Sequence, residues 1–133
     1  MKIFAKSSDY SKLFKENKSC DFRIEVLRQT NFNASAQVTL TNLIVPPLEA
    51  DTEVFILCSI CAYSQLGDVY RRVLRVVQLY ASKSARQVFL EPLEKYDLNQ
   101  SGFQEIRFSF RDAKDQFIKF DSGYDTIIGL EIK

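Results

Sequence analysis

Two cysteines, Cys58 and Cys61, have the CxxC spacing, the residue pattern in this chain with the clearest potential for chemistry. In zinc ribbons and thiol oxidoreductases this spacing lies in a turn or at the start of a helix. Here it lies inside residues 53–63, the most apolar stretch, whose β-branched and aromatic content favours a strand. Residues three apart on a strand point to opposite faces. We therefore expect two separately buried thiols that share no metal and form no disulfide.

Pairs of carboxylates occur at Asp112 and Asp115 and at Glu91 and Glu94, and such pairs can serve as general acid and base. The first pair is more typical of a hairpin turn, in which Asp forms local hydrogen bonds, than of a glycosidase or an EF-hand calcium loop. The chain contains no His, so it lacks the commonest general base and the commonest partner of a nucleophilic Ser or Cys. We expect no catalytic residue, no metal, no cofactor and no enzymatic activity.

Arginine is concentrated at Arg71, Arg72 and Arg75, next to Tyr70. Such a group can contact nucleic acid or the carboxylates of a partner protein. It is equally typical of a solvated strand edge, where charge prevents aggregation. The chain has 18 basic and 17 acidic residues and a net charge of +1, which is not the broad basic face of a nonspecific DNA-binding protein. We therefore expect no specific nucleic-acid binding, and both interpretations of the arginines stay open.

The composition is that of one folded domain, because 133 residues with 46% hydrophobic side chains can bury a substantial core. The 11 Phe and 6 Tyr favour half-buried β-sheet surfaces. No apolar run approaches the ~18 residues of a membrane span, and the first residues lack the apolar region of a secretory signal. Three Cys without such a signal indicate free thiols in a reducing compartment. We expect a protein that is made and kept inside a cell.

Alternation of apolar and polar residues predicts about eight strands, with turns every ~8–15 residues between them. This spacing, without crossover helices, predicts an all-β sandwich, barrel or jelly roll and argues against a parallel α/β fold. Residues 8–17 favour one or two helical turns or an irregular arm. We expect an N-terminal arm over residues 1–20 and one β domain over residues 21–133. The expected strands are residues 22–27, 38–45, 53–63, 73–79, 88–90, 106–110, 118–120 and 126–132.

A series of short motifs follows one another over the last 80 residues of the chain. They are a Gly-Asp turn, a Val-Leu-Arg-Val-Val strand, a Phe-x-x-Pro segment followed by a Tyr, a long alternating strand ending in Arg-Asp, a Phe-x-x-Gly turn and a final apolar strand. In this order and spacing they resemble the minor capsid, or penton, proteins of Polinton/Maverick elements and related small double-stranded DNA viruses. The motifs lie at residues 66–70, 73–77, 89–92, 96, 103–112, 118–123 and 127–133.

The resemblance implies a single jelly roll, an eight-stranded antiparallel β-sandwich preceded by a short N-terminal arm or helical turn. Such a protein forms homopentamers at the five-fold vertices of an icosahedral capsid, among trimers of a double jelly-roll major capsid protein. It is made in the host cytoplasm and ends in the virion. The alternatives are a non-enzymatic β-sandwich module that binds a protein or a carbohydrate and, less favoured, a carboxylate enzyme.

Cyclic rings place one patch of each subunit against a different patch of its neighbour. Our hypothesis for these patches pairs the arginine-rich edge of one subunit with the acidic turns of the next. The candidate interface residues are Arg71, Arg72, Arg75, Asp68, Asp112 and Asp115.

Overall fold

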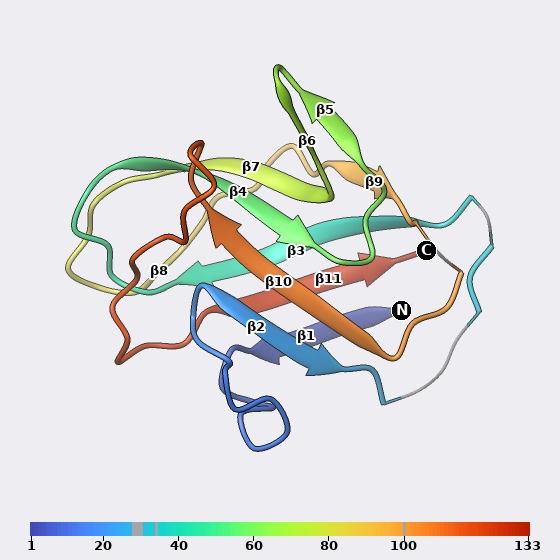
Figure 1. Ribbon diagram of the computed structural model, residues 1–133, viewed down its shortest axis with the longest axis horizontal. Helices are drawn as coiled ribbons and strands as arrows, with labels where there is room; N and C mark the ends of the chain where they lie inside the picture. Colours follow the sequence, from blue (N-terminus) through green and yellow to red (C-terminus); the bar gives the residue numbers. More distant parts are fainter. Residues whose placement is uncertain (28–30, 34, 100) are drawn as a thin grey trace.

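The computed structural model describes residues 1–27, 31–33, 35–99 and 101–133, and within these ranges the chain consists of strands, turns and loops with no helix (Figure 1). The predicted all-β class is confirmed. Accordingly, the described part contains no helix that could cross a membrane. The strands are β1 (Lys2–Lys6), β2 (Asp21–Glu25), β3 (Gln37–Val45), β4 (Thr52–Cys58), β5 (Ser64–Leu66), β6 (Val69–Arg71), β7 (Val73–Leu79), β8 (Arg86–Gln87), β9 (Lys95–Asp97), β10 (Glu105–Arg111) and β11 (Ile127–Ile132).

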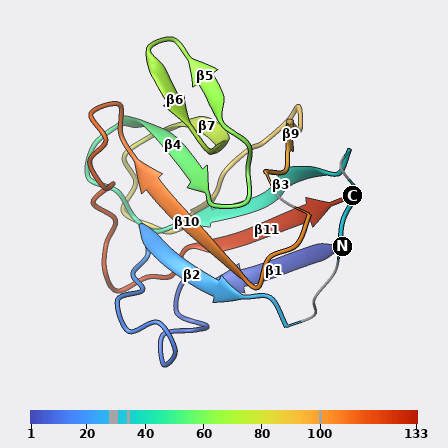
Figure 2. The same cartoon turned by 45° about the vertical axis from the view of Figure 1, so that its right-hand side comes forward.

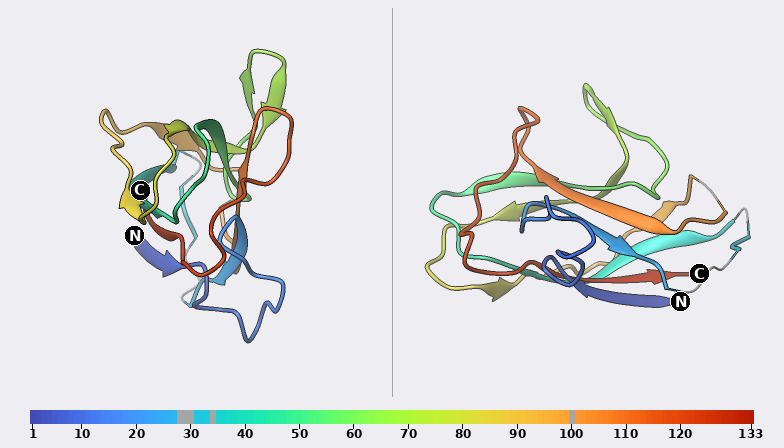
Figure 3. Two further views of the ribbon diagram at one scale, coloured as in Figure 1. Left: turned by 90° about the vertical axis from the view of Figure 1, so that its left-hand side faces the viewer. Right: turned by 60° about the horizontal axis from the view of Figure 1, so that its bottom comes forward.

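Two antiparallel sheets pack against each other in a sandwich-like arrangement, and Figure 3 shows them as two layers. The first sheet has the order β1-β11-β3-β8, with β9 also paired to β3. The second sheet has the order β2-β10-β4-β7. The short strands β5 and β6 form a separate hairpin that projects beyond the sandwich (Figure 2). The last strand of each large sheet therefore lies between two strands from the first half of the chain: β11 lies between β1 and β3, and β10 lies between β2 and β4.

The alternating pattern of β2, β3 and β10 turns their apolar side chains into the space between the sheets. On β3, Leu40 and Leu43 are three residues apart and yet both are buried. A β-bulge explains this, because Leu40 pairs with Leu130 and Asn42 pairs with Gly129, leaving one extra residue on β3. The bulge restores the inward direction for the second half of the strand.

Aromatic rings on the second sheet fill the centre of this core. Phe108 and Phe110 on β10 are completely buried, and the ring of Phe22 on β2 lies 5.3 Å from that of Phe108, centroid to centroid. The ring of Phe120 meets Phe110 edge-on at 5.7 Å. Such pairs add stabilisation beyond the apolar area that they bury.

The N-terminal segment contributes a strand to the first sheet. Residues 2–6, expected to belong to an arm, form β1 and pair with β11 over its whole length. Residues 7–16 form a series of turns and not the helical turn that was one expectation. Ser7 holds these turns to the sandwich, because its hydroxyl accepts a hydrogen bond from the Thr126 amide (3.0 Å) and donates one to Asp125 (2.9 Å).

Several expected strands differ from the observed ones, because pairing partners and not local alternation decide where a strand forms. Residues 65–68, expected as a loop, belong to the β5–β6 hairpin, whose turn contains Gly67 with a positive φ of 62°. Residues 88–90, expected as a strand, lie outside the strands and directly follow β8. Residues 95–97, where no strand was expected, form β9. Residues 118–120 make isolated bridges at most, in place of the expected strand.

Candidate functional site

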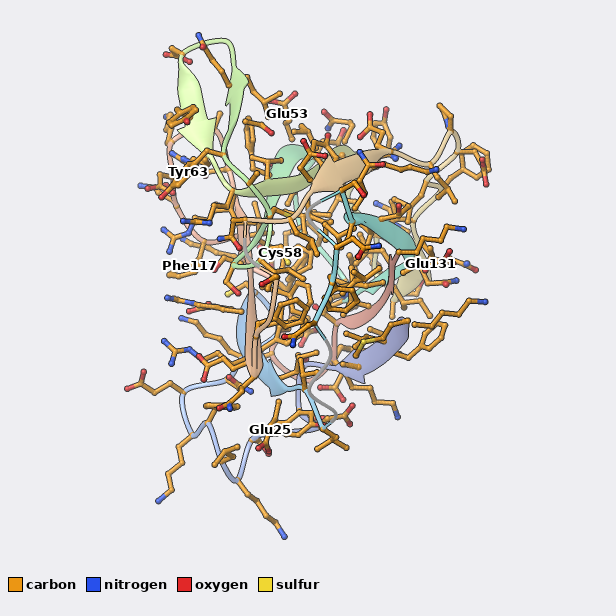
Figure 4. The ribbon with its side chains drawn as sticks, turned by 90° about the vertical axis from the view of Figure 1, so that its right-hand side faces the viewer. Glu25, Glu53, Cys58, Tyr63, Phe117 and Glu131 are labelled. Carbon is orange, nitrogen blue, oxygen red and sulfur yellow. The ribbon has the colours of Figure 1, made fainter. Side chains whose placement is uncertain are left out.

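A groove of about 450 Å³ lies on the outer face of the second sheet. The β5–β6 hairpin forms one wall, and the turn after β10 forms the other. Figure 4 shows Tyr63 and Phe117 on this outer side, with Glu131 of the first sheet on the opposite side of the molecule. We call it the arginine groove. Its lining residues are Leu57, Cys58, Ser59, Tyr63, Tyr70, Arg71, Arg72, Arg107, Ser109, Arg111 and Asp115.

The alternation of β10 sets the floor of the groove. Because Ile106, Phe108 and Phe110 point into the core, the residues between and after them face outward. These residues are Arg107, Ser109 and Arg111. The pattern that forms the core therefore also places two arginines in one row on the outer face of β10. At ~3.4 Å per residue, the ends of the row are separated by about 14 Å.

Carboxylates of the same chain pair with three of the four arginines in the groove. Arg71 and Arg111 share Asp115, whose Oδ1 lies 2.8 Å from Arg71 Nη1 and 3.3 Å from Arg111 Nη1. Arg107 forms a bidentate pair with Asp21, with both N···O distances at 2.8 Å. Two carboxylates therefore pair with three of the four guanidinium groups, and the groove retains an excess of positive charge.

Arg72 is held in place without a carboxylate. Its guanidinium lies 4.4 Å from the centre of the Tyr63 ring, and its Nη1 donates to the Cys61 carbonyl at 3.2 Å. Tyr63 in turn stacks on Tyr70, with 5.0 Å between the ring centres. Within the described ranges, no carboxylate lies within ion-pair distance of Arg72. The side chain is thus oriented by stacking while its charge stays available to a ligand.

Asp21 supports the floor of the groove from β2. Burial by itself raises the pKa of this carboxyl, but hydrogen bonds from Arg107 and Ser109, together with the Arg107 charge, lower it further than burial raises it. The pKa of Asp21 therefore lies below its ordinary value. The ionised form is stabilised in the folded state, so folding and deprotonation of Asp21 are linked.

The Asp21→Asn variant should show this linkage. Because the folded-state pKa is lowered, the stabilisation is complete above the unfolded pKa of ~3.9 and is lost as the pH falls through the folded-state value. We expect a loss of about 1–2 kcal/mol in unfolding free energy at pH 7, reduced by the partial exposure of Arg107. Urea titrations from pH 7 to pH 2 measure it. Asp68→Asn, at the hairpin tip, is the control, and a deficit as large at pH 2 as at pH 7 would contradict the linkage.

Only part of the expected interface set lies at the groove. Arg71 and Asp115, which the hypothesis pairs between neighbouring subunits, form an ion pair within one chain. Arg72 lies beside them at the groove wall. Asp68 is exposed in the turn of the β5–β6 hairpin.

Arg75 and Asp112 have internal partners. Arg75 is buried, and its Nη1 donates to the Pro92 carbonyl at 2.9 Å. Its Nε lies 3.2 Å from a carboxylate oxygen of Glu94, close enough for an ion pair but without the alignment of a hydrogen bond. Asp112 Oδ1 accepts the Lys114 and Gln116 amides, so its expected role in a turn is confirmed. Arg75 therefore ties β7 to the segment before β9 and is not part of an open surface.

The expected placement of the two CxxC cysteines on opposite faces of a strand is wrong. β4 ends at Cys58, and a turn closed by the Cys61 amide and the Cys58 carbonyl (3.1 Å) brings the two side chains together. Both are buried. Hydrogen bonding to Cys58, followed by burial, raises the pKa of the Cys61 thiol far above its usual range. A thiol with a raised pKa is a poor nucleophile.

Two other hollows carry less chemistry. The larger, of about 880 Å³, is a hollow between loops at one end of the sandwich, and its charged residues are balanced in sign: Glu49, Lys83, Lys119 and Asp121. The smaller, of about 230 Å³, lies between residues 14–17 and the start of β2. Among the described residues, no group of three or more Cys, Asp or Glu is placed to hold a metal. The arginine groove is therefore the strongest candidate site.

Sequence reasoning identified Arg71 and Arg72 but missed Arg107, Arg111 and Tyr63. The signal for the two β10 arginines was present, because they occupy polar positions of a clear alternation. That this row lies beside the β5–β6 hairpin depends on strand order, which alternation does not reveal. No protein-family model matches the chain, and no curated protein matches it in sequence.

Proposed function

We propose that this chain is a single jelly-roll subunit that assembles as a pentamer at the five-fold vertices of an icosahedral capsid. The observation that carries the proposal is the strand order. Because β8 and β9 both pair with the same side of β3, they fill one position, and each large sheet then has four positions. Numbered along the chain without the β5–β6 hairpin, the sheets run 1-8-3-6 and 2-7-4-5. This order is the one expected of a jelly roll, a fold common in capsid proteins, and it supports the proposal.

Two kinds of observation support the capsid role independently. Strand order depends on which segments pair, whereas the resemblance of residues 54–133 to penton proteins depends on local motifs. A jelly roll alone would not distinguish a capsid protein from a lectin or a cupin, because all three share this fold. The penton-like motifs favour the capsid protein among these, and the two observations together favour a structural subunit.

The two lateral sides of the sandwich offer different surfaces, as a ring requires. One side ends in β7 and the β8–β9 edge, where Phe89 and Leu93 are exposed. The other ends in β1 and β2, near which Leu13 and Leu27 are exposed. Exposed apolar side chains on both sides fit a contact in which the two patches meet on neighbouring subunits.

Light scattering coupled to size-exclusion chromatography tests the proposal. We expect a species of five times the chain mass of 15.4 kDa, and rings with five-fold symmetry in negative-stain electron micrographs. The charged and apolar parts of a contact respond differently to salt, so the run is repeated from low to high ionic strength. A strict monomer at every ionic strength and protein concentration would overturn the pentamer.

A second candidate function is that of a binding module, and the arginine groove specifically favours it. The groove has charged and aromatic walls, and its volume lies within the ~300–1,000 Å³ of many ligand sites. A monomer that binds an anionic ligand in this groove would support the module over the capsid subunit.

A further inference from the structure

We propose that the arginine groove binds a short acidic peptide segment of a partner protein through its carboxylates. This inference does not depend on the capsid proposal, because the groove is complete within a single chain. It rests on the charge of the groove, the orientation of its arginines and the spacing of the β10 row.

The charge of the groove is local. The whole chain carries a net charge of +1, yet four arginines line this one hollow and only Asp115 among its lining residues is acidic. Even with Asp21 behind Arg107, positive groups outnumber negative ones. A concentrated charge on a nearly neutral protein attracts an anionic segment at short range, within about 8 Å at physiological salt.

The orientation of the arginines favours carboxylates. Asp115 already shows how this site holds one, because its Oδ1 bridges Arg71 and Arg111. The Arg71 and Arg111 side chains are themselves 24% and 23% exposed, so a carboxylate from outside can reach them beside Asp115. Arg72, fixed on Tyr63, adds a third donor group whose orientation is set before binding. Guanidinium groups arranged in this way match the planar geometry of carboxylates.

The β10 row favours an extended chain. Arg107 and Arg111 face outward four residues apart, and Ser109 lies between them. An extended peptide repeats its side chains at the same interval, so acidic residues at positions i and i+4 would reach both ends of the row. The exposed rings of Tyr63 and Tyr70 offer an apolar wall for the residues between them.

Single-stranded nucleic acid fits the groove less well. Such ligands need aromatic faces free for base stacking and a basic track along several phosphates. Here the Tyr63 ring is engaged on its faces by both Arg72 and Tyr70. The groove is also short, with about 450 Å³ for its occupant. These features leave room for one or two carboxylates but no continuous phosphate track.

The probe is a fluorescein-labelled Gly/Ser peptide with Glu at positions i and i+4, and the control peptide has Gln at both. Fluorescence anisotropy is measured at ~10 mM ionic strength, where the Debye length is about 30 Å, and again at 0.15 M, where it is ~8 Å. We expect the Glu peptide to bind, the Gln peptide not to bind, and added salt to weaken binding.

Three variants locate the binding. Arg72→Gln should weaken it about tenfold, as expected for a lost charge-assisted hydrogen bond. Arg86→Gln, on β8 of the first sheet, removes the same charge outside the groove and should leave binding unchanged. Asp115→Asn removes the competing carboxylate and should tighten binding, a gain that unfolding cannot imitate. Asn suits this position because it tolerates the positive φ of 64°.

Three results would overturn the proposal. One is no binding of the Glu peptide at low ionic strength by the wild-type chain. Another is an equal loss in Arg72→Gln and Arg86→Gln together with no gain in Asp115→Asn, which would indicate nonspecific attraction. The third is tighter binding of a labelled dodecathymidylate than of the Glu peptide, which would make the groove a nucleic-acid site. The anisotropy assay measures peptide binding to the groove whether the chain is a monomer or a pentamer. A failure of the peptide to bind would therefore leave the measurement of the oligomeric state unaffected.

Discussion

Replacing Phe108 by alanine is expected to lower the free energy of unfolding by about 3–5 kcal/mol, the range typical of a buried Phe→Ala change. Phe108 is completely buried at the centre of β10, which pairs with β2 on one side and β4 on the other. Its removal leaves a cavity against Phe22, whose ring centre lies 5.3 Å away, and both neighbouring strands are held by their own hydrogen bonds. The surroundings therefore cannot close over the gap at low cost.

Phe89→Ala provides the matched control. It is the same chemical change at a side chain that is 82% exposed in the single chain, and surface changes of this kind cost about 0.5 kcal/mol or less. Both variants are compared at a protein concentration at which the chain is monomeric, because Phe89 lies in the proposed subunit contact. Urea titration followed by far-ultraviolet circular dichroism measures both, since the chain has no Trp to serve as a fluorescent reporter. Equal midpoints for the two variants would show that the β10 face is not the core.

Arg75→Glu is expected to destabilise the fold by at least about 2 kcal/mol, because it buries a carboxylate without a donor. In the wild-type chain the guanidinium donates to the Pro92 carbonyl and faces the Glu94 carboxylate. A glutamate at this position would meet an acceptor and a like charge at a side chain that is only 11% exposed. The partial exposure of Glu94 keeps the expected loss below that of a fully buried ion pair.

Two further variants separate charge from packing. Arg75→Met keeps an aliphatic stem and loses the hydrogen bond to Pro92, so we expect a smaller loss of about 1 kcal/mol. Arg86→Glu makes the same charge reversal at a more accessible position and should cost less than Arg75→Glu. Thermal and urea denaturation rank the three. If Arg75→Glu is as stable as Arg86→Glu, Arg75 does not tie β7 to the segment before β9 in solution.

Local alternation predicted β10 best, because the pattern through Ile106, Phe108 and Phe110 identified both its core face and its outer face. The expected strand over residues 73–79 matches β7, although that segment is an apolar run in which Val73 and Leu74 are both buried. β1 was missed because its five residues have only Ala5 fully buried, so a short edge strand resembles a polar arm.

The groove and the CxxC turn depend on information that local pattern does not contain. The apolar run from Val54 to Ala62 looks like one long strand, but the chain turns after Cys58, where the Arg107 carbonyl accepts the Ser59 amide. Likewise, Arg71 and Asp115 are 44 positions apart in sequence, and only the packing of the β5–β6 hairpin beside the turn after β10 makes them partners. Contacts between distant segments, rather than composition, create this site.

The central positions of β10 and β11 have a consequence for synthesis on the ribosome. β11 lies between β1 and β3 and pairs with both, and β10 lies between β2 and β4 in the same way. Both central strands come later in the chain than the four strands with which they pair. While residues 1–104 emerge, one edge of each of those strands therefore waits without its partner. Unpaired edges invite pairing with other chains, and contacts between distant segments form slowly. The nascent chain thus passes through a stage at which binding by a chaperone would offer most protection, and this stage ends only when the last strand has left the exit tunnel.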